Sequence, residues 1–169
     1  MLKKLTIKNF ALIDYAEIIF TENFNVLSGE TGAGKSIVLD SLNFVLGAKA
    51  DKNQIRSLES ECLVTAEFDL SSASWAEDLY NELDYDYDDT LIISRKFNVS
   101  GKNSIKINGN PANVSILKRF TSFLVDVHGQ SEHFSLLSST NQLALLDKFA
   151  GEKLFNLKKD IANILSVYK

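Results

Sequence analysis

One eight-residue stretch, residues 29–36, constrains this chain more than any other. Its sequence, Gly-Glu-Thr-Gly-Ala-Gly-Lys-Ser, has the glycine, lysine and hydroxyl spacing of a phosphate-binding loop. Glycines let the backbone turn with its N–H groups inward and approach a phosphate closely. A helix that begins at the end of such a loop adds unpaired N–H groups and the positive end of its dipole. The stretch therefore predicts a nucleotide-binding loop.

The chemistry of this motif assigns a role to each polar side chain. We expect the ammonium group of Lys35 to reach the β- and γ-phosphate oxygens, and the hydroxyl of Ser36 to ligate Mg²⁺. The other residues expected to contact the nucleotide belong to the loop and the first helical turn: Gly29, Glu30, Thr31, Gly32, Ala33, Gly34 and Ile37.

The segments on either side of the loop support this prediction. Residues 24–27 are Phe-Asn-Val-Leu and predict a short buried strand that enters the loop. Residues 37–46 predict a helix that leaves it, with Gly47 as its C-cap. Strand, loop and helix in this order are the context that a phosphate-binding loop requires.

The rest of the chain predicts an α/β P-loop NTPase fold with a mixed sheet. Alternating or continuous apolar residues predict further strands at 2–8, 16–20, 62–70, 90–97, 104–107 and 123–127. Helices are expected at 73–83, capped by Ser71 or Ser72, and at 113–120. Turns are expected at 98–103 and 108–111.

Composition limits the possible functions. The 169 residues correspond to about one domain, and the net charge of −4 excludes a generally basic nucleic-acid binder. DNA contact would need a local patch, and the candidates are Lys3, Lys4, Lys8, Arg95, Lys96, Lys102 and Lys106, with a solvated face as the alternative. The single cysteine, Cys62, excludes an internal disulfide framework, and no signal-peptide core is found, so a cytoplasmic location is expected.

A second motif, Asp-Val-His-Gly-Gln at residues 126–130, has three interpretations. Asp126 could end a Walker B strand, the motif could be a GTPase switch, or Gln130 could be a Q-loop ligand of Mg²⁺. A GTPase requires an Asn-Lys-x-Asp motif downstream, and a small kinase requires an arginine-bearing lid. The chain has neither after residue 129. The Q-loop interpretation is favoured, with a self-contained P-loop kinase as the alternative and a pure interaction domain as a third possibility.

Two further patterns in the last third are less specific. His128, Glu132 and His133 form an incomplete metal-ligand set, so a structural or phosphate-proximal role is favoured over a metal site. The apolar residues Leu154, Leu157, Ile161, Ile164 and Tyr168 recur at heptad spacing. Two heptads fit either the start of a coiled coil or an ordinary terminal helix.

Several of these stretches together resemble the RecN family of bacterial DNA-repair proteins. The resemblance is carried by residues 1–13 (MLKKLTIKNFALI), by the loop at 29–36 and by residues 125–133 (VDVHGQSEH). The Ile-Asn-Gly turn at 107–109 and the segment LLDKFAG at 145–151 also match. The likeness extends over essentially the whole chain.

This resemblance implies an SMC-like ATPase that acts in repair of DNA double-strand breaks by recombination. Its ABC-type head would be built from the two ends of one polypeptide, with residues 1–151 as the N-terminal half and residues 152–169 beginning a coiled coil. Gly32, Gly34, Lys35 and Ser36 would hold the phosphates and Mg²⁺, and Gln130 would be the Q-loop ligand. ATP would join two such heads as a homodimer, and DNA would be a partner of the full-length protein.

The resemblance also identifies what this chain lacks. We find no Leu-Ser-Gly-Gly signature, no downstream Walker B with a catalytic Glu and no switch histidine. Lys49 stands where the family often has arginine, whereas Arg56 matches the family and is a candidate for a phosphate or DNA contact, or an exposed arginine. With Lys35 and Gln130 as its only catalytic candidates, the chain is expected to bind ATP with little turnover.

Overall fold

The structure is a computed structural model of the chain, and it describes residues 1–29, 34–125, 161 and 164. The chain forms two compact units, Met1–Asp126 and Val127–Lys169. In the second unit the structure describes only Ile161 and Ile164, which are helical and exposed. The predicted boundary between residues 151 and 152 therefore stays a prediction.

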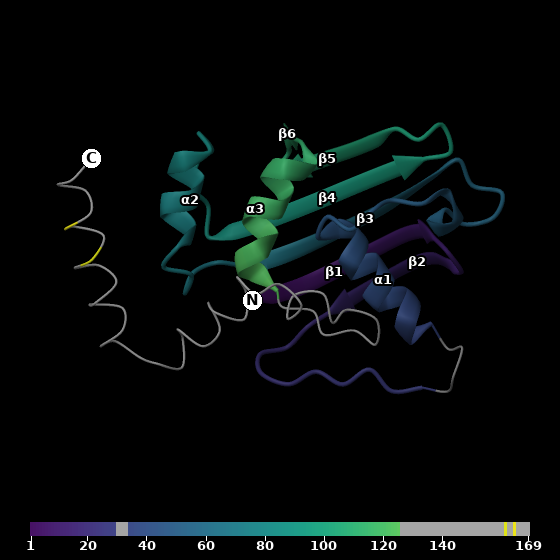
Figure 1. Cartoon of the computed structure of the whole chain (residues 1–169). Coiled ribbons are helices and arrows are strands. Elements are labelled where there is room, and N and C mark those ends of the chain that lie inside the picture. Colours follow the sequence, from purple (N-terminus) through teal and green to yellow (C-terminus); the bar gives the residue numbers. More distant parts are fainter. Residues whose placement is uncertain (30–33, 126–160, 162–163, 165–169) are drawn as a thin grey trace. The chain divides into compact units, whose positions relative to one another are not determined.

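The first unit is built on a six-stranded sheet with the order β2-β1-β3-β4-β5-β6 (Figure 1). The strands are β1 (Leu2–Phe10), β2 (Ile13–Ile19), β3 (Glu61–Asp69), β4 (Thr90–Asn98), β5 (Asn103–Ile107) and β6 (Asn110–Ala112). The helices are α1 (Lys35–Val45), the short 3-10 helix η1 (Lys52–Gln54), α2 (Ala76–Glu82) and α3 (Val114–Leu124).

Every pair of neighbouring strands in this sheet is antiparallel. The predicted α/β class is confirmed, but the predicted mixed sheet is wrong for the described residues. Three of the five pairings join strands that follow one another through tight turns, and a tight turn can only join antiparallel strands. The predicted strand before the phosphate-binding loop, which could have added a parallel partner, is not formed.

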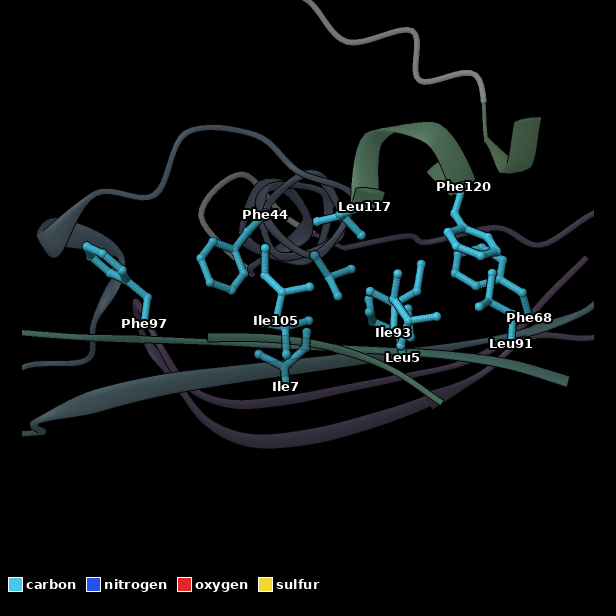
Figure 2. Packing of buried hydrophobic residues seen from close by; sticks show 14 of the residues in the cluster. Leu5, Ile7, Phe44, Phe68, Leu91, Ile93, Phe97, Ile105, Leu117 and Phe120 are labelled. Carbon is cyan, nitrogen blue, oxygen red and sulfur yellow. The ribbon is translucent and has the colours of Figure 1, made fainter. Parts of the chain in front are cut away.

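Side-chain alternation along the strands puts the hydrophobic core on one face of the sheet. In β3 the even-numbered residues Cys62, Val64, Ala66 and Phe68 are buried, as the sequence predicts. Helices α1 and α3 supply the other side of the core through Phe44, Leu117 and Phe120, which Figure 2 shows above the aliphatic side chains of the strands. The even-numbered and odd-numbered residues therefore have different environments on β3 and β4.

The hairpin between β5 and β6 depends on one Asn-Gly pair. Asn108 and Gly109 have φ values of 46° and 83°, the left-handed conformations that a tight two-residue hairpin needs. The Asn108 side chain accepts a hydrogen bond from the backbone N–H of Ile92 (2.6 Å) and donates one to the carbonyl of Thr90 (3.0 Å). The predicted turn is confirmed, and its first residue also holds the start of β4.

Two predicted elements differ from the structure because side-chain contacts decide them. Helix α2 begins only at Ala76, and neither predicted serine caps it, because Ser71 donates its backbone N–H and its hydroxyl to the carboxylate of Asp69. The predicted strand at 123–127 is wrong at its first two residues, since α3 continues through Leu124. Phe123 stacks on Trp75 with 5.0 Å between ring centroids, which favours the longer helix.

In the part of the chain that the structure describes, no helix has both the length and the hydropathy that crossing a bilayer requires.

The carboxylate of Asp69 predicts a specific pH dependence of stability. Hydrogen bonds from Ser71 and then from Lys3 lower the pKa of Asp69 to about 2. A group whose pKa is lower in the folded state stabilises the fold above its unfolded pKa, about 3.9, and loses this effect as the pH falls through the folded value. We expect Asp69→Asn to be less stable than wild type near pH 6, with the difference vanishing toward pH 2 in urea unfolding experiments.

The matched control for this experiment is Asp78→Asn. Asp78 is exposed on α2 and has no ion pair with any described residue. Its substitution should change the free energy of unfolding near pH 6 by no more than about 0.5 kcal/mol. Identical pH profiles for wild type and Asp69→Asn would contradict the assignment.

Candidate nucleotide-binding site

The two ends of the phosphate-binding loop lie close together. Of the loop, the structure describes Gly29 and Gly34–Ser36, while Glu30, Thr31, Gly32 and Ala33 lie outside the described residues. The ammonium group of Lys35 donates a hydrogen bond to the carbonyl oxygen of Gly29. The side chain of Lys35 therefore extends from the start of α1 to the first residue of the loop. From this position its ammonium group can reach a bound phosphate.

The start of α1 has the features of an anion-binding helix terminus. Its N-cap is Gly34, at φ 91° and ψ 0°, and an added Cβ would meet nothing within 4 Å. The left-handed conformation, rather than lack of space, is what favours glycine here. The N-cap makes no side-chain hydrogen bond, and no acidic residue occurs in the first turn. The helix dipole and its first N–H groups are therefore well suited to an anion.

Helix α1 is held at its opposite end by a buried arginine. Arg95 of β4 is only 2% exposed, and its guanidinium donates from Nη1 to the carbonyls of Phe44 and Ala48, the latter at 2.7 Å. Its Nε donates to the side-chain oxygen of Asn103 at 3.0 Å. The guanidinium carbon also lies 4.5 Å from the centroid of the Phe44 ring, a cation–π contact. Burial lowers the pKa of Arg95, but a guanidinium remains charged in proteins.

A second contact to the end of α1 comes from α3. The hydroxyl of Thr121 donates to the carbonyl of Leu46 at 3.0 Å. The observed C-cap is Leu46, and Gly47, the predicted C-cap, follows it with φ 109° and donates its N–H to the Phe44 carbonyl at 3.1 Å. Carbonyls at the C-terminal end of α1 thus have partners from β4 and α3, which fixes the direction of the helix relative to the sheet.

This position of Arg95 corrects the predicted basic patch. Arg95 was one of its candidates, but the side chain points into the core, away from Lys96. The alternation of Leu91, Ile93 and Phe97 with polar residues already places residue 95 on the apolar side of β4. The sequence thus contained the signal that separates Arg95 from the lysines around it.

Arg56 has a structural contact near the β1–β2 turn. Its guanidinium donates to the carbonyl of Leu12 at 2.7 Å, and its backbone N–H donates to the carbonyl of Asn9 at 3.0 Å. The N–H of Ala11 donates to the carbonyl of Gln54 at 2.7 Å, which ties the same turn to η1. The side chain is half-buried rather than fully exposed. A phosphate or DNA contact by Arg56 stays a prediction.

The segment that precedes the loop is not the predicted buried strand. Phe24, Val26 and Leu27 are 85%, 70% and 54% exposed, and residues 24–27 form no strand. Instead, the Asn25 side chain bonds to the backbone and hydroxyl of Thr21 at 2.9–3.1 Å. The physical reason is that a strand requires a hydrogen-bonded neighbour, and no described residue supplies one.

The predicted magnesium ligands are only partly described. Ser36 presents an exposed hydroxyl oxygen in the first turn of α1, the hard oxygen ligand that Mg²⁺ prefers. Gln130 and Asp126 lie outside the described residues, as do His128, Glu132 and His133. Within the described residues, no three His, Cys, Asp or Glu side chains form a cluster that could hold a metal ion.

Comparison with known proteins identifies the family. The RecF/RecN/SMC N terminal domain matches residues 1–128. The chain belongs to this family. A DNA repair protein RecN from Xylella fastidiosa is 38% identical over 150 residues, which are 89% of this chain and 27% of that protein. Another RecN, from Halalkalibacterium halodurans, is 35% identical over 169 residues, 99% of this chain and 30% of that protein.

A solved structure gives the same fold. It comes from work on ATP-driven dimerization and DNA stimulated activation of SMC ATPases, and it matches with a TM-score of 0.65 at 20% identity. The match covers 88% of this chain and 98% of the solved one. The predicted resemblance to RecN is confirmed, as is an SMC head-like α/β fold. The chain spans less than a third of the length of these RecN relatives.

The buried arginine generates a prediction about the stability of this family member. Arg95→Met keeps the apolar stem but leaves the carbonyls of Phe44 and Ala48 and the Asn103 side chain without their donor. We expect the free energy of unfolding to fall by about 2–4 kcal/mol, measured by urea denaturation.

The neighbouring substitution Lys96→Met is the matched control, because Lys96 is exposed on the opposite face. It should change the free energy of unfolding by no more than about 0.5 kcal/mol. Equal effects of the two substitutions would show that Arg95 does not clamp α1.

Proposed function

We propose that the chain is the ATP-binding N-terminal part of an SMC-like ATPase that acts in DNA double-strand break repair by recombination. The observation that carries the nucleotide-binding part is the position of Lys35 at the N-terminus of α1. Its ammonium group donates a hydrogen bond to the carbonyl oxygen of Gly29, at the other end of the loop. The family match and the RecN relatives support the DNA-repair part.

In this proposal the phosphates of ATP lie at the N-terminus of α1. The N–H groups of residues 34–37 donate to them, and Lys35 neutralises part of their charge. Ser36 supplies an oxygen ligand to Mg²⁺, and Gln130 supplies a second as the Q-loop residue. The ion, when bound, neutralises charge on the phosphate oxygens. Glu30, Thr31, Gly32 and Ala33 complete the cradle.

We also propose that a C-terminal region of the same protein completes the head. The exposed segment 24–27 supports this. Three large apolar side chains are in water there, directly before the phosphate-binding loop. A strand from another part of the polypeptide would supply the missing ladder and cover these side chains. The RecN relatives are long enough to contain such a part, since this chain covers 27–30% of them.

Hydrolysis in this proposal needs groups from outside residues 1–169. Around the described end of the loop, no carboxylate occurs in the first turn of α1 to act as a base for water. We infer that ATP joins two heads and that residues of the C-terminal part complete the site for turnover. The similar SMC structure, described with ATP-driven dimerization, supports this order of events. A cytoplasmic location and a coiled coil from residue 152 complete the proposal.

Calorimetric titration with ATP tests the nucleotide-binding part. We expect wild type to bind ATP in the presence of Mg²⁺ and Lys35→Ala to bind about 10–100-fold more weakly, the loss of one or two charge-assisted hydrogen bonds. Lys49→Ala, an exposed lysine just beyond α1, is the matched control and should bind as wild type does. If wild type gives no heat of binding, the nucleotide-binding proposal is wrong and the chain is an interaction domain only.

The same proteins distinguish the half-site from the alternative of a self-contained kinase with Asp126 as its Walker B residue. We expect little phosphate release by the chain alone. Fast release that Lys35→Ala abolishes would contradict the half-site. Consumption of ATP that depends on an added phosphoacceptor would favour the kinase.

The exposed segment generates a separate prediction. Phe24→Ser combined with Val26→Ser should weaken association with the C-terminal part of the full-length protein at least tenfold, because two large apolar contacts are lost. The stability of the chain alone should not change, since both side chains are already exposed. The control Leu12→Ser removes an equally exposed apolar side chain at the β1–β2 turn and should leave association unchanged.

Co-purification followed by titration calorimetry measures this association. Unchanged affinity of the double variant would remove segment 24–27 from the interface. A lower free energy of unfolding for the double variant, measured without the C-terminal part, would show that these side chains are already packed within the chain.

A further inference from the structure

Helix α2 and the loop that follows it form an acidic region. Of its carboxylates, only that of Glu82 has an ion pair with a described residue, Arg119 of α3. The region therefore presents a surplus of negative charge to solvent. Its acidic residues are all exposed: Glu77, Asp78, Glu82, Asp84, Asp86, Asp88 and Asp89.

Two tyrosines anchor the loop of this region to the rest of the protein. The ring of Tyr85 packs edge-on against Phe120, with 6.0 Å between centroids. The ring of Tyr87 packs edge-on against Tyr80 at 5.4 Å. The residues that alternate with these tyrosines present exposed carboxylates from an anchored segment. We call them the acidic strip: Asp84, Asp86 and Asp88.

The far end of β4 carries the opposite charge. Two adjoining shallow depressions there share Lys96, Ser104 and Lys106, and one of them also includes Lys102 of the β4–β5 turn. Lys96 pairs with Glu61 at 3.2 Å, whereas Lys102 and Lys106 have no ion pair with any described residue. We call the three lysines of these depressions the lysine patch.

The acidic strip and the lysine patch lie at opposite ends of β4. Asp88 accepts a hydrogen bond from the N–H of Thr90, the first residue of the strand, at 2.8 Å. Lys96 is six residues further along, which is about 20 Å at about 3.3 Å per residue. Figure 1 shows α2 beside the start of β4 and the β4–β5 hairpin at its other end. The two surfaces of one copy cannot meet, because the sheet holds them apart.

We propose that the lysine patch of one copy of this chain docks on the acidic strip of a second copy. Charge complementarity selects this partner, since every copy carries both surfaces. The contact joins different surfaces of the two copies, so it is head-to-tail and leaves one strip and one patch free for further copies. It uses no residue of the phosphate-binding loop and needs no ATP. It is therefore separate from the ATP-dependent joining of heads proposed above.

The chemistry of the contact predicts weak, salt-sensitive association. The residues that line the depressions include no aromatic or arginine side chain, the usual anchors of a tight protein interface. Exposed ion pairs are individually weak, so the contact needs several of them together. Salt screens such pairs over a Debye length of about 10 Å at 0.1 M. The assembly should therefore form and dissociate reversibly as the salt concentration changes.

Sedimentation velocity without nucleotide tests this inference. The lysine variant combines Lys102→Gln with Lys106→Gln, and the acidic variant combines Asp84→Asn with Asp86→Asn. Asparagine suits residue 84, whose φ is 59°. Wild type should self-associate at about 50 mM salt and be monomeric at about 500 mM. Each variant alone should associate about tenfold more weakly than wild type at the lower salt concentration.

A mixture of the two variants gives the decisive result. The lysine variant keeps its acidic strip and the acidic variant keeps its lysine patch, so one contact can form between them. The mixture should therefore form a one-to-one pair that grows no further, whereas wild type forms larger assemblies as its concentration rises. A mixture that stays monomeric while wild type associates would overturn the inference.

The matched control is Lys49→Gln combined with Lys52→Gln. It removes two exposed lysines, one just beyond α1 and one on η1, and should self-associate as wild type does. All variants should keep the wild-type midpoint in urea unfolding. A control that loses association as fully as the lysine variant would show that only net charge matters, and wild type that is monomeric at low salt would contradict the contact outright.

Two further outcomes would assign the association to other surfaces and overturn the inference. Association that persists at high salt and in both variants would belong to the exposed apolar segment 24–27. Association that appears only with ATP and Mg²⁺ would belong to the nucleotide-dependent joining of heads. Titration calorimetry of the two variants with ATP separates the proposals, because both should bind ATP as wild type does. Failed ATP binding by a wild type that still self-associates would refute only the nucleotide site.

Discussion

The structure depends on one buried cation at the end of one helix. Arg95 is inaccessible to water and has no carboxylate partner in the described residues, so the carbonyls of Phe44 and Ala48 take the place of a counter-ion. These carbonyls carry the negative end of the α1 dipole, which a cation stabilises. The cost of burying the guanidinium is thus offset by hydrogen bonds, by the helix end and by the Phe44 ring. The same helix begins at the phosphate-binding loop, where the opposite sign of charge is required.

Strand β4 connects the two faces of the sheet. Arg95 and Lys96 are neighbours in sequence, yet one clamps α1 and the other is exposed on the opposite face of the sheet. The period of two along a strand is the reason, because adjacent side chains point to opposite faces. A displacement of β4 by one residue would exchange these roles, burying an ammonium group and exposing the core. The register is fixed on both sides by β3 and β5.

The sequence predicted what local patterns determine. The glycines of the phosphate-binding loop, the alternation in β3, Gly47 after α1 and the Asn-Gly turn at 108–109 are short-range signals, and the structure has each described one as expected. The exceptions depend on side-chain contacts that such patterns do not contain. Ser71 bonds to its near neighbour Asp69 rather than capping α2, and Phe123 stacks on the distant Trp75 rather than starting a strand. The three acceptors of Arg95 are likewise visible only once β4, β5 and α1 are assembled.

The same distinction, between local patterns and contacts formed on assembly, explains why the segments on the two sides of the phosphate-binding loop differ in order. On the exit side, α1 has its C-terminal carbonyls paired and its core residues Phe44 and Val45 buried, so the helix is fixed before any ligand binds. On the entry side, Phe24 and Val26 have the composition of a strand, but none of the described residues is a neighbour with which they form a ladder. Phosphate binding needs mainly the helix terminus and Lys35, whereas alignment of a reacting water needs the whole loop held rigidly. We therefore expect nucleotide binding and turnover to separate in this chain, since the entry side becomes rigid only when another part of the protein covers it.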